Sequence, residues 1–287
     1  MPEEQKNSLK EKLLAAAKKQ CRVRSCPSEG ALPVGSSKIG GLPDVPEDFV
    51  WPTYEGREDD HDPFKLRPLS FLAQFRVEDV ASADEEHLLP PDGLLSFFYE
   101  VETQRWGFDP EDAGSARVYW FPGTAALSRA ADVPAGIVRG ETLLPEMAVG
   151  FDTEISLPDI EYLPDEADWD EFQACRAACG CPEEEDEVTK LLGYPDVIQN
   201  PMEEECECVT RGLYCGNSED SRQASPEEQA DILAKAGEWR MLFQMGTVAT
   251  EDYELMFGDA GYIYFWIRRE DLLARRFDKA WLILQCY

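Results

Sequence analysis

The chain has 287 residues, of which 43% are hydrophobic and 11% aromatic, a composition typical of a globular protein and not of a disordered one. Its 58 Asp and Glu residues outnumber 27 Lys and Arg residues, and the net charge of −31 disfavours nucleic acid as a partner and favours a basic protein or a cation. No apolar run approaches the ~20 residues that span a bilayer, and the first residues lack the basic and apolar regions of a signal peptide. We therefore expect a cytoplasmic protein without membrane binding. The net charge of −31 has an alternative explanation, which is an acidic surface that only confers solubility.

The N-terminal segment predicts a helix followed by a loop. Residues 2–20 place Leu9 and Leu13 on one helical face and Lys and Glu on the other, which is typical of an amphipathic helix. Cys21 and Cys26 follow in a stretch that contains proline and glycine, and we expect them in a loop. Because the chain has nine cysteines and no secretion signal, they are expected to be thiols or metal ligands and not disulfides.

Two sets of strand-like runs recur in the same order. The first set lies at residues 71–75, 92–99 and 117–121, and the second at 241–245, 259–267 and 280–287. The middle run of each set begins with a turn containing Asp and Gly and continues in aromatic and β-branched residues, which is typical of a strand. The separation of roughly 170 residues predicts an internally duplicated β unit, with the two middle runs as equivalent strands of two sheets.

The region between the two sets is irregular and acidic. Its first part, residues 128–158, is broken by prolines and glycines, which predicts extended edge segments. Residues 161–207 then contain sixteen acidic residues against two basic ones. We therefore describe residues 161–220 as an acidic, Cys-rich insert between halves at about 37–127 and 226–287 of a single domain that spans residues 1–287.

The cysteines of the insert allow two interpretations. Cys179 and Cys181 form one C-x-C pair, and Cys206 and Cys208 form a second pair about 25 residues later. Four thiolates from two hairpin-like pairs would build a tetrahedral zinc site if they converge, although zinc ribbons more often use C-x2-C. The alternative is burial as small apolar side chains, and in that case no cofactor is expected.

A helix is predicted immediately before the second set of strands. Ser225 is a typical N-cap, Pro226 suits the first helical position, and Glu228 completes a capping box. Gly237 would end this helix. A further short helix is expected at residues 269–276.

Five segments together resemble a known family. They are residues 35–46, 68–74, 192–199, 258–261 and 281–287. In this order they resemble the YwqG-like family, also described as the domain of unknown function DUF1963, from about Ser37 to Tyr287. The resemblance implies an α+β fold in which internally duplicated, mainly antiparallel β-sheet units are flanked by helices. It implies no established enzymatic activity, and for some relatives a role as immunity proteins against bacterial toxins.

The shared segments supply all the candidate binding residues except Gln244, which comes from the second set of strands. These candidates are Lys38, Gly40, Gly41, Asp44, Gln74, Asp196, Gln199, Gln244 and Asp259. For Gln74 and Gln244, which hold matching places in the two sets of strands, a structural role is favoured over ligand contact, because a buried amide must be hydrogen-bonded. The segment around Lys38 is not a phosphate-binding P-loop, since its lysine precedes the glycines.

Two functions compete. The favoured one is a non-enzymatic protein-binding scaffold, including the toxin-immunity type, because the chain has only two histidines, His61 and His87, and no catalytic motif. The alternative is a small-ligand or metal-dependent enzyme that acts in the cleft between the halves, where residues 37–44 and 258–261 would converge. A concave pocket with ionisable groups of shifted pKa would favour the second function, and a flat acidic face the first.

Overall fold

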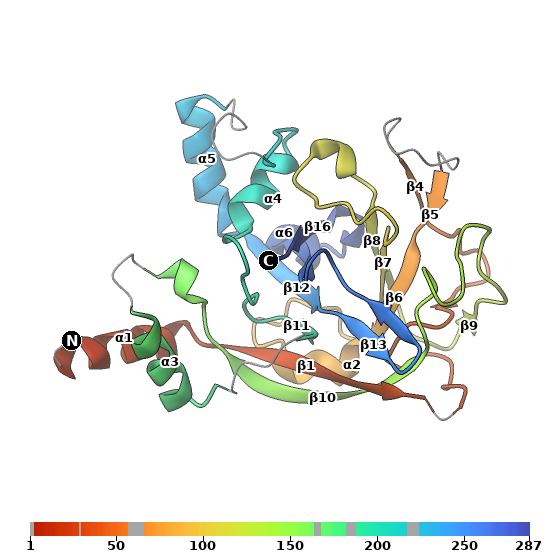
Figure 1. The fold of residues 1–287 in the computed structure, drawn as a ribbon, viewed down its shortest axis with the longest axis horizontal. Coiled ribbons are helices and arrows are strands. Elements are labelled where there is room, and N and C mark those ends of the chain that lie inside the picture. The colour runs from red at the N-terminus through yellow and green to blue at the C-terminus, as the bar shows by residue number, and fades with distance from the viewer. Residues whose placement is uncertain (1–2, 29, 57–65, 164–167, 182–187, 217–223) are drawn as a thin grey trace.

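A single curved antiparallel sheet of ten strands forms the main body of the protein. The computed structural model describes residues 3–28, 30–56, 66–163, 168–181, 188–216 and 224–287. The sheet curves so far that its two outermost strands, β8 (Ala116–Phe121) and β16 (Trp281–Gln285), contact each other (Figure 1). The predicted α+β class is confirmed. The two sheets expected from the two sets of strand-like runs are joined in one sheet.

The two halves of the sheet have the same order of strands on either side of a central pair. The central strands are β1 (Lys18–Pro27) and β10 (Met147–Ser156). The first half continues through β2 (Lys38–Ile39), β6 (Ser70–Arg76), β7 (Leu94–Tyr99) and β8. The second half continues through β11 (Lys190–Leu191), β12 (Trp239–Met245), β15 (Tyr262–Arg268) and β16. The two predicted middle runs are thus β7 and β15, each second from an outer end of the sheet.

The central strands correct two predictions. Cys21 and Cys26 lie within β1 and not in a loop, and β10 lies in the interior of the sheet and not at an edge. The many polar residues of β1 made it unlike a typical strand in sequence. Their charges are paired with residues of the neighbouring strand β10, since Arg22 Nε lies 3.0 Å from Glu154 Oε2. Cross-strand ion pairs of this kind, together with pairing along both edges, favour the strand.

Four phenylalanines join the two halves in the interior of the curved sheet. The ring of Phe97 lies 4.6 Å from that of Phe243 and 5.2 Å from that of Phe265, and Phe75 lies 5.2 Å from Phe243. All four rings are fully buried. Because aromatic pairs at these separations add to the stabilisation from burial, this cluster fixes one half against the other.

Helices pack at one end of the sheet and on the outside of its second half (Figure 1). The helices α1 (Glu3–Ala16) and α3 (Trp169–Ala178) pack together and bury Leu13 and Phe172. The helices α4 (Glu203–Val209) and α5 (Pro226–Ala236) pack side by side next to β12. The capping box predicted for α5 is confirmed, and Gly237 is its C-cap. In the described part of the chain, no helix has both the length and the apolar character needed to cross a bilayer.

The remaining elements are short. The helices are α2 (Val77–Val80), α6 (Arg269–Leu273) and the 3-10 turns at Ala81–Ala83, Pro110–Asp112, Ile160–Tyr162 and Phe277–Lys279. The strands form three small pairs, β3 (Asp44–Val45) with β9 (Ser128–Arg129), β4 (Thr53–Glu55) with β5 (Leu66–Pro68), and β13 (Val248–Thr250) with β14 (Tyr253–Leu255).

We predict that removal of residues 280–287 leaves insoluble protein. This change removes β16, whose Leu282, Ile283 and Leu284 are buried, at about 1.5–3 kcal/mol for each side chain, and it exposes an edge of β15. Solubility and thermal unfolding measure the effect. Deletion of Tyr287 alone, which is 82% exposed, is the control and should be tolerated; a soluble, cooperatively melting protein without β16 would contradict the prediction.

Candidate functional site

A buried glutamine in the first half holds a turn in place through its side-chain amide. Gln74 Oε1 accepts a hydrogen bond from the backbone N–H of Asp44 at 2.9 Å. Its Nε2 donates to the backbone oxygen of Ser36 at 2.8 Å and to Oδ2 of Asp44 at 2.6 Å. We call this arrangement an amide clasp: the side-chain amide of a glutamine is hydrogen-bonded to an aspartate and to the backbone oxygen of a residue on the other side of the turn.

The second half repeats the amide clasp. Gln244 Oε1 accepts from the backbone N–H of Asp196 at 2.9 Å, and its Nε2 donates to Val188 O at 3.1 Å and to Asp196 Oδ2 at 2.7 Å. A buried lysine accompanies each clasp: Lys38 pairs with Gln74 across neighbouring strands, and Lys190 pairs with Gln244. The same contacts therefore fix the same turn twice.

A repeated sequence explains the two clasps. Residues 38–45 and 190–197 both read K-x-x-G-x-P-D-V. The chain then takes 30 residues from Asp44 to Gln74 but 48 from Asp196 to Gln244. Because these intervals differ, a search at one constant separation of roughly 170 residues misses the motif, and our sequence analysis placed residues 190–197 in the acidic insert.

The turn inside the motif has a left-handed backbone in both copies. Gly40 and Gly41 have φ of 64° and 69°, and Leu192 and Gly193 have φ of 61° and 74°. Glycine is required at Gly40, because a Cβ there would lie 2.1 Å from the backbone oxygen of Pro145. The predicted binding residues Gly40 and Gly41 thus shape the turn.

Most of the other predicted binding residues are also engaged within the chain. Lys38, Asp44, Gln74 and Gln244 are fully buried. The ammonium group of Lys38 donates to Glu146 at 2.7 Å, and burial lowers its pKa more than this contact raises it. These four side chains therefore have structural contacts and no access for a ligand.

The remaining predicted residues do not line one common cavity, and Gln199 Nε2 donates to the backbone oxygen of Cys286 at 2.8 Å. Asp196 binds the ammonium group of Lys190 at 2.6 Å, and the backbone oxygen of Asp259 accepts from the N–H of Tyr287 at 3.1 Å. Gly41 borders a cavity of about 500 Å³ between the halves. Among the described residues, the second half contributes Thr250, Asp252 and Tyr253 to this cavity and not the 258–261 turn. Gln199 lines a larger cavity on the second half.

That larger cavity has a volume of about 1060 Å³ and combines aromatic rings with carboxylates. Five rings border it, those of Phe108, Tyr162, Tyr194, Trp239 and Trp266. The first turn of α4 adds three consecutive glutamates, Glu203, Glu204 and Glu205, and Lys18 and Arg240 add two basic groups. We call this cavity the aromatic pocket. Apart from Gln199, sequence reasoning missed it, because its walls come from elements far apart in the chain.

Four of its ionisable groups have shifted pKa values, and burial raises those of Tyr162 and Tyr194. The hydroxyl of Tyr162 donates to the carboxylate of Glu203, with both oxygens at 3.0 Å. Burial raises the pKa of Glu203 in spite of this hydrogen bond. The ammonium group of Lys18 lies 4.4 Å from the ring centre of Tyr194, and burial, followed by the charge of Arg240, lowers the pKa of Lys18.

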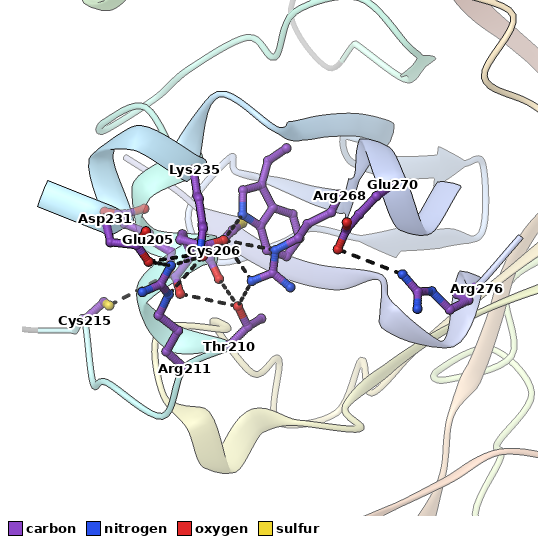
Figure 2. A network of polar contacts seen from close by, with 12 residues as sticks. Glu205, Cys206, Thr210, Arg211, Cys215, Asp231, Lys235, Arg268, Glu270 and Arg276 are labelled. Atoms are coloured by element: carbon purple, nitrogen blue, oxygen red, sulfur yellow. Dashed lines mark hydrogen bonds and ion pairs between the residues drawn. The ribbon is translucent and has the colours of Figure 1, made fainter. Parts of the chain in front are cut away.

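A buried carboxylate anchors α4 to the sheet beside the pocket (Figure 2). Glu207 accepts hydrogen bonds from Arg211 Nε at 2.9 Å, from Arg268 Nη2 at 2.8 Å and from Trp239 Nε1 at 2.9 Å. The guanidinium of Arg268 also lies 4.6 Å from the ring centre of Trp239. This network fixes α4, which carries the three glutamates, relative to Trp239, one of the aromatic residues that line the pocket.

The four cysteines of the predicted zinc site do not come together. Cys179 and Cys181 belong to the apolar cluster of α1 and α3, whereas Cys206 lies beneath α4 against the outer face of β12 and β15. Cys206 and Cys208 lie on a helix and not in a hairpin, since the acidic residues at its start favour the helix N-terminus. No group of three or more His, Cys, Asp or Glu in the described part of the chain could hold a metal ion. Of the two histidines of the chain, His61 lies outside the described residues.

We predict that Glu207→Gln lowers the free energy of unfolding by about 1.5–3 kcal/mol at neutral pH, because it removes the charge that accepts hydrogen bonds from two guanidinium groups, each on a side chain that is 27% exposed. Burial alone would raise the pKa of Glu207, but the hydrogen bonds from Arg211, Arg268 and Trp239 hold it below its ordinary value. The contribution of this carboxylate is therefore present above the ordinary glutamate pKa and is lost as the pH falls through the lowered value. Urea unfolding at several pH values measures both effects.

The matched control for this prediction is Glu270→Gln. This carboxylate is 75% exposed and lies 3.9 Å from Arg276 (Figure 2), so its loss should cost less than about 1 kcal/mol. Equal losses in the two variants, or a Glu207→Gln effect that grows as the pH falls, would contradict the role of the buried carboxylate.

Comparison with known families identifies the chain. Residues 37–286 match the family described as a domain of unknown function, DUF1963. A comparison with curated proteins gives no match. The matched region includes both copies of the K-x-x-G-x-P-D-V motif, both amide clasps apart from Ser36, and every pocket residue named above except Lys18. The chain therefore belongs to the DUF1963 family.

Proposed function

We propose that this protein is a non-enzymatic binding protein whose aromatic pocket receives a basic side chain of a protein partner. The observation that carries the proposal is the combination of five aromatic rings with the glutamates at positions 203–205 around one cavity. A cation over an aromatic face gains about 0.5–2 kcal/mol, more where it is desolvated. Carboxylates nearby supply the opposite charge, and the net charge of −31 raises the rate of encounter with a basic partner.

The chain's own basic groups support this reading of the pocket. The ammonium group of Lys18 lies over the ring of Tyr194, so one wall already accepts a cation in the expected way. The guanidinium of Arg240 donates to the backbone oxygens of Gly237 at 2.8 Å and Trp239 at 3.0 Å and lies 3.4 Å from Glu86. These contacts engage the guanidinium group of Arg240 within the chain.

A second candidate is an enzyme that acts on a small ligand in the same pocket. Its supporting observation is Glu203, a buried carboxyl of raised pKa, which is the usual property of a general acid. Binding is the better supported function, because both carboxylate oxygens of Glu203 are already within 3.0 Å of the Tyr162 hydroxyl. Most of the residues that line the pocket belong to the second half, and neither the 37–44 segment nor the 258–261 turn is among them.

We further propose that the two halves descend from one duplicated unit. The repeated motif and the repeated amide clasp support this origin. A cytoplasmic location fits the thiol state of the nine cysteines, which form no disulfide among the described residues. A toxin-immunity protein, the role that the family resemblance implies for some relatives, would be one form of this function.

We predict that short lysine-containing peptides bind in the micromolar to millimolar range, and that the double variant Glu204→Gln, Glu205→Gln weakens binding at least tenfold. The cause is the loss of two negative charges at the pocket wall. Isothermal titration calorimetry at low ionic strength measures the affinity. The control, Glu251→Gln with Glu254→Gln, removes the same charge from exposed residues of the β13–β14 hairpin and should change affinity less than twofold. Equal weakening by both double variants, or equal binding of a peptide with glutamine in place of lysine, would contradict the pocket.

A further inference from the structure

A basic side chain of the protein itself lies in the aromatic pocket. Lys18, the first residue of β1, lines the pocket, and its ammonium group lies 4.4 Å from the ring centre of Tyr194. This ring lies 6.2 Å from the ring of Tyr162, whose hydroxyl donates to Glu203. Burial has the largest effect on the pKa of Lys18 and lowers it, and Glu203 is one of two carboxylates whose charge opposes this shift. Lys18 therefore already has the aromatic face and the nearby carboxylate that the pocket would offer to a cation of a partner.

The ring of Tyr194 is held in place by backbone and side-chain groups around Lys18. The backbone N–H of Tyr194 donates to Oγ of Ser156 at 2.9 Å, and its hydroxyl donates to the backbone oxygen of Ala16 at 2.8 Å. Ser156 is also the residue of β10 that pairs with Lys18. The aromatic face and the lysine are thus anchored at the same point of the sheet, and these hydrogen bonds would keep Tyr194 in place if the ammonium group left.

The ammonium group of Lys18 is bound less firmly than the ring. Within the part of the chain that the structure describes, it makes no hydrogen bond or ion pair, and its contact is with the face of Tyr194. A cation–π contact stabilises only modestly where the cation keeps part of its hydration. Because the stem of a lysine is long and flexible, this ammonium group can leave the ring without a change in the backbone of β1.

Two other basic residues close to the pocket are engaged elsewhere. The guanidinium of Arg240 donates to two backbone oxygens and lies 3.4 Å from Glu86. The ammonium group of Lys19, the next residue of β1, lies 3.2 Å from Oε1 of Glu85, as expected for successive strand residues that point to opposite faces. Of these three basic residues, Lys18 is the one whose charge lies over an aromatic ring of the pocket.

We propose that Lys18 is an internal occupant of the cation position in the aromatic pocket, and that the basic side chain of the partner displaces its ammonium group from Tyr194. This inference rests on the proposed function, because it uses the same pocket and the same partner group. A site that is vacant for only a fraction of the time binds its ligand more weakly in proportion to that fraction, and two cations in one pocket repel each other. Lys18 thus sets an affinity threshold that a basic side chain must exceed.

The test removes the charge of Lys18 and keeps most of its length. Isothermal titration calorimetry of the full-length protein with a short end-blocked peptide, a single lysine among glycines, should show a gain in affinity of roughly fivefold or more in Lys18→Met. Lys19→Met is the matched control, because it removes the same charge from a side chain that is 47% exposed, and it should change the affinity less than twofold. Equal gains in both variants, or no gain in Lys18→Met, would overturn the inference and leave the proposed function intact. Absence of binding by both the wild type and Lys18→Met would overturn both.

A second measurement follows the ammonium group directly in the wild-type protein. The methylene protons next to it lie near the ring of Tyr194, and the ring current shifts their NMR signals upfield. These signals are assigned by their absence from the spectrum of Lys18→Arg. Addition of the lysine peptide should move them toward the ordinary lysine position, with the same concentration dependence as the calorimetric binding curve. Binding of the peptide without movement of the Lys18 signals would overturn the inference.

Discussion

The structure depends on satisfying the buried polar groups of two tight turns. Each K-x-x-G-x-P-D-V turn brings a lysine and backbone polar groups into the interior, where an unpaired donor or acceptor costs about 1–3 kcal/mol. One glutamine from the neighbouring long strand meets three of these groups at once, Gln74 in the first half and Gln244 in the second. The amide clasps lock the turns against the sheet, and the phenylalanine cluster then fixes the halves against each other.

The same construction gives the two halves different outer faces. In the first half, Phe49 and Trp51 cover the aromatic face of the sheet. In the second half, Met202 and Cys206 are fully buried in the apolar cluster that contains Trp266, and α4 and α5 border the aromatic pocket. The network around Glu207 fixes α4 beside this pocket. The two halves thus share an order of strands but differ in the segments that cover their outer faces.

The sequence predicted the elements with strong local signals. The long strands follow from runs of aromatic and β-branched residues, and the start of α5 follows from the Ser225 capping box. It did not predict β1, because the polar side chains of this strand are compensated by residues far away in the chain, as Arg22 is by Glu154. The repeated motif was visible in the sequence but was hidden by unequal spacing. The pocket could not be predicted, since it needs Lys18, Phe108, Glu203 and Trp266 from separate elements.

The central claim is that the stability of the fold depends on the amide clasps. Urea unfolding of Gln74→Leu and Gln244→Leu tests this claim most directly. Each substitution keeps the volume nearly unchanged but removes three hydrogen bonds. The account predicts a loss of at least ~3 kcal/mol in the free energy of unfolding for each variant. Gln229→Leu, at an exposed position of α5, should lose less than about 0.5 kcal/mol. Losses at Gln74 and Gln244 as small as that of Gln229→Leu would contradict the account.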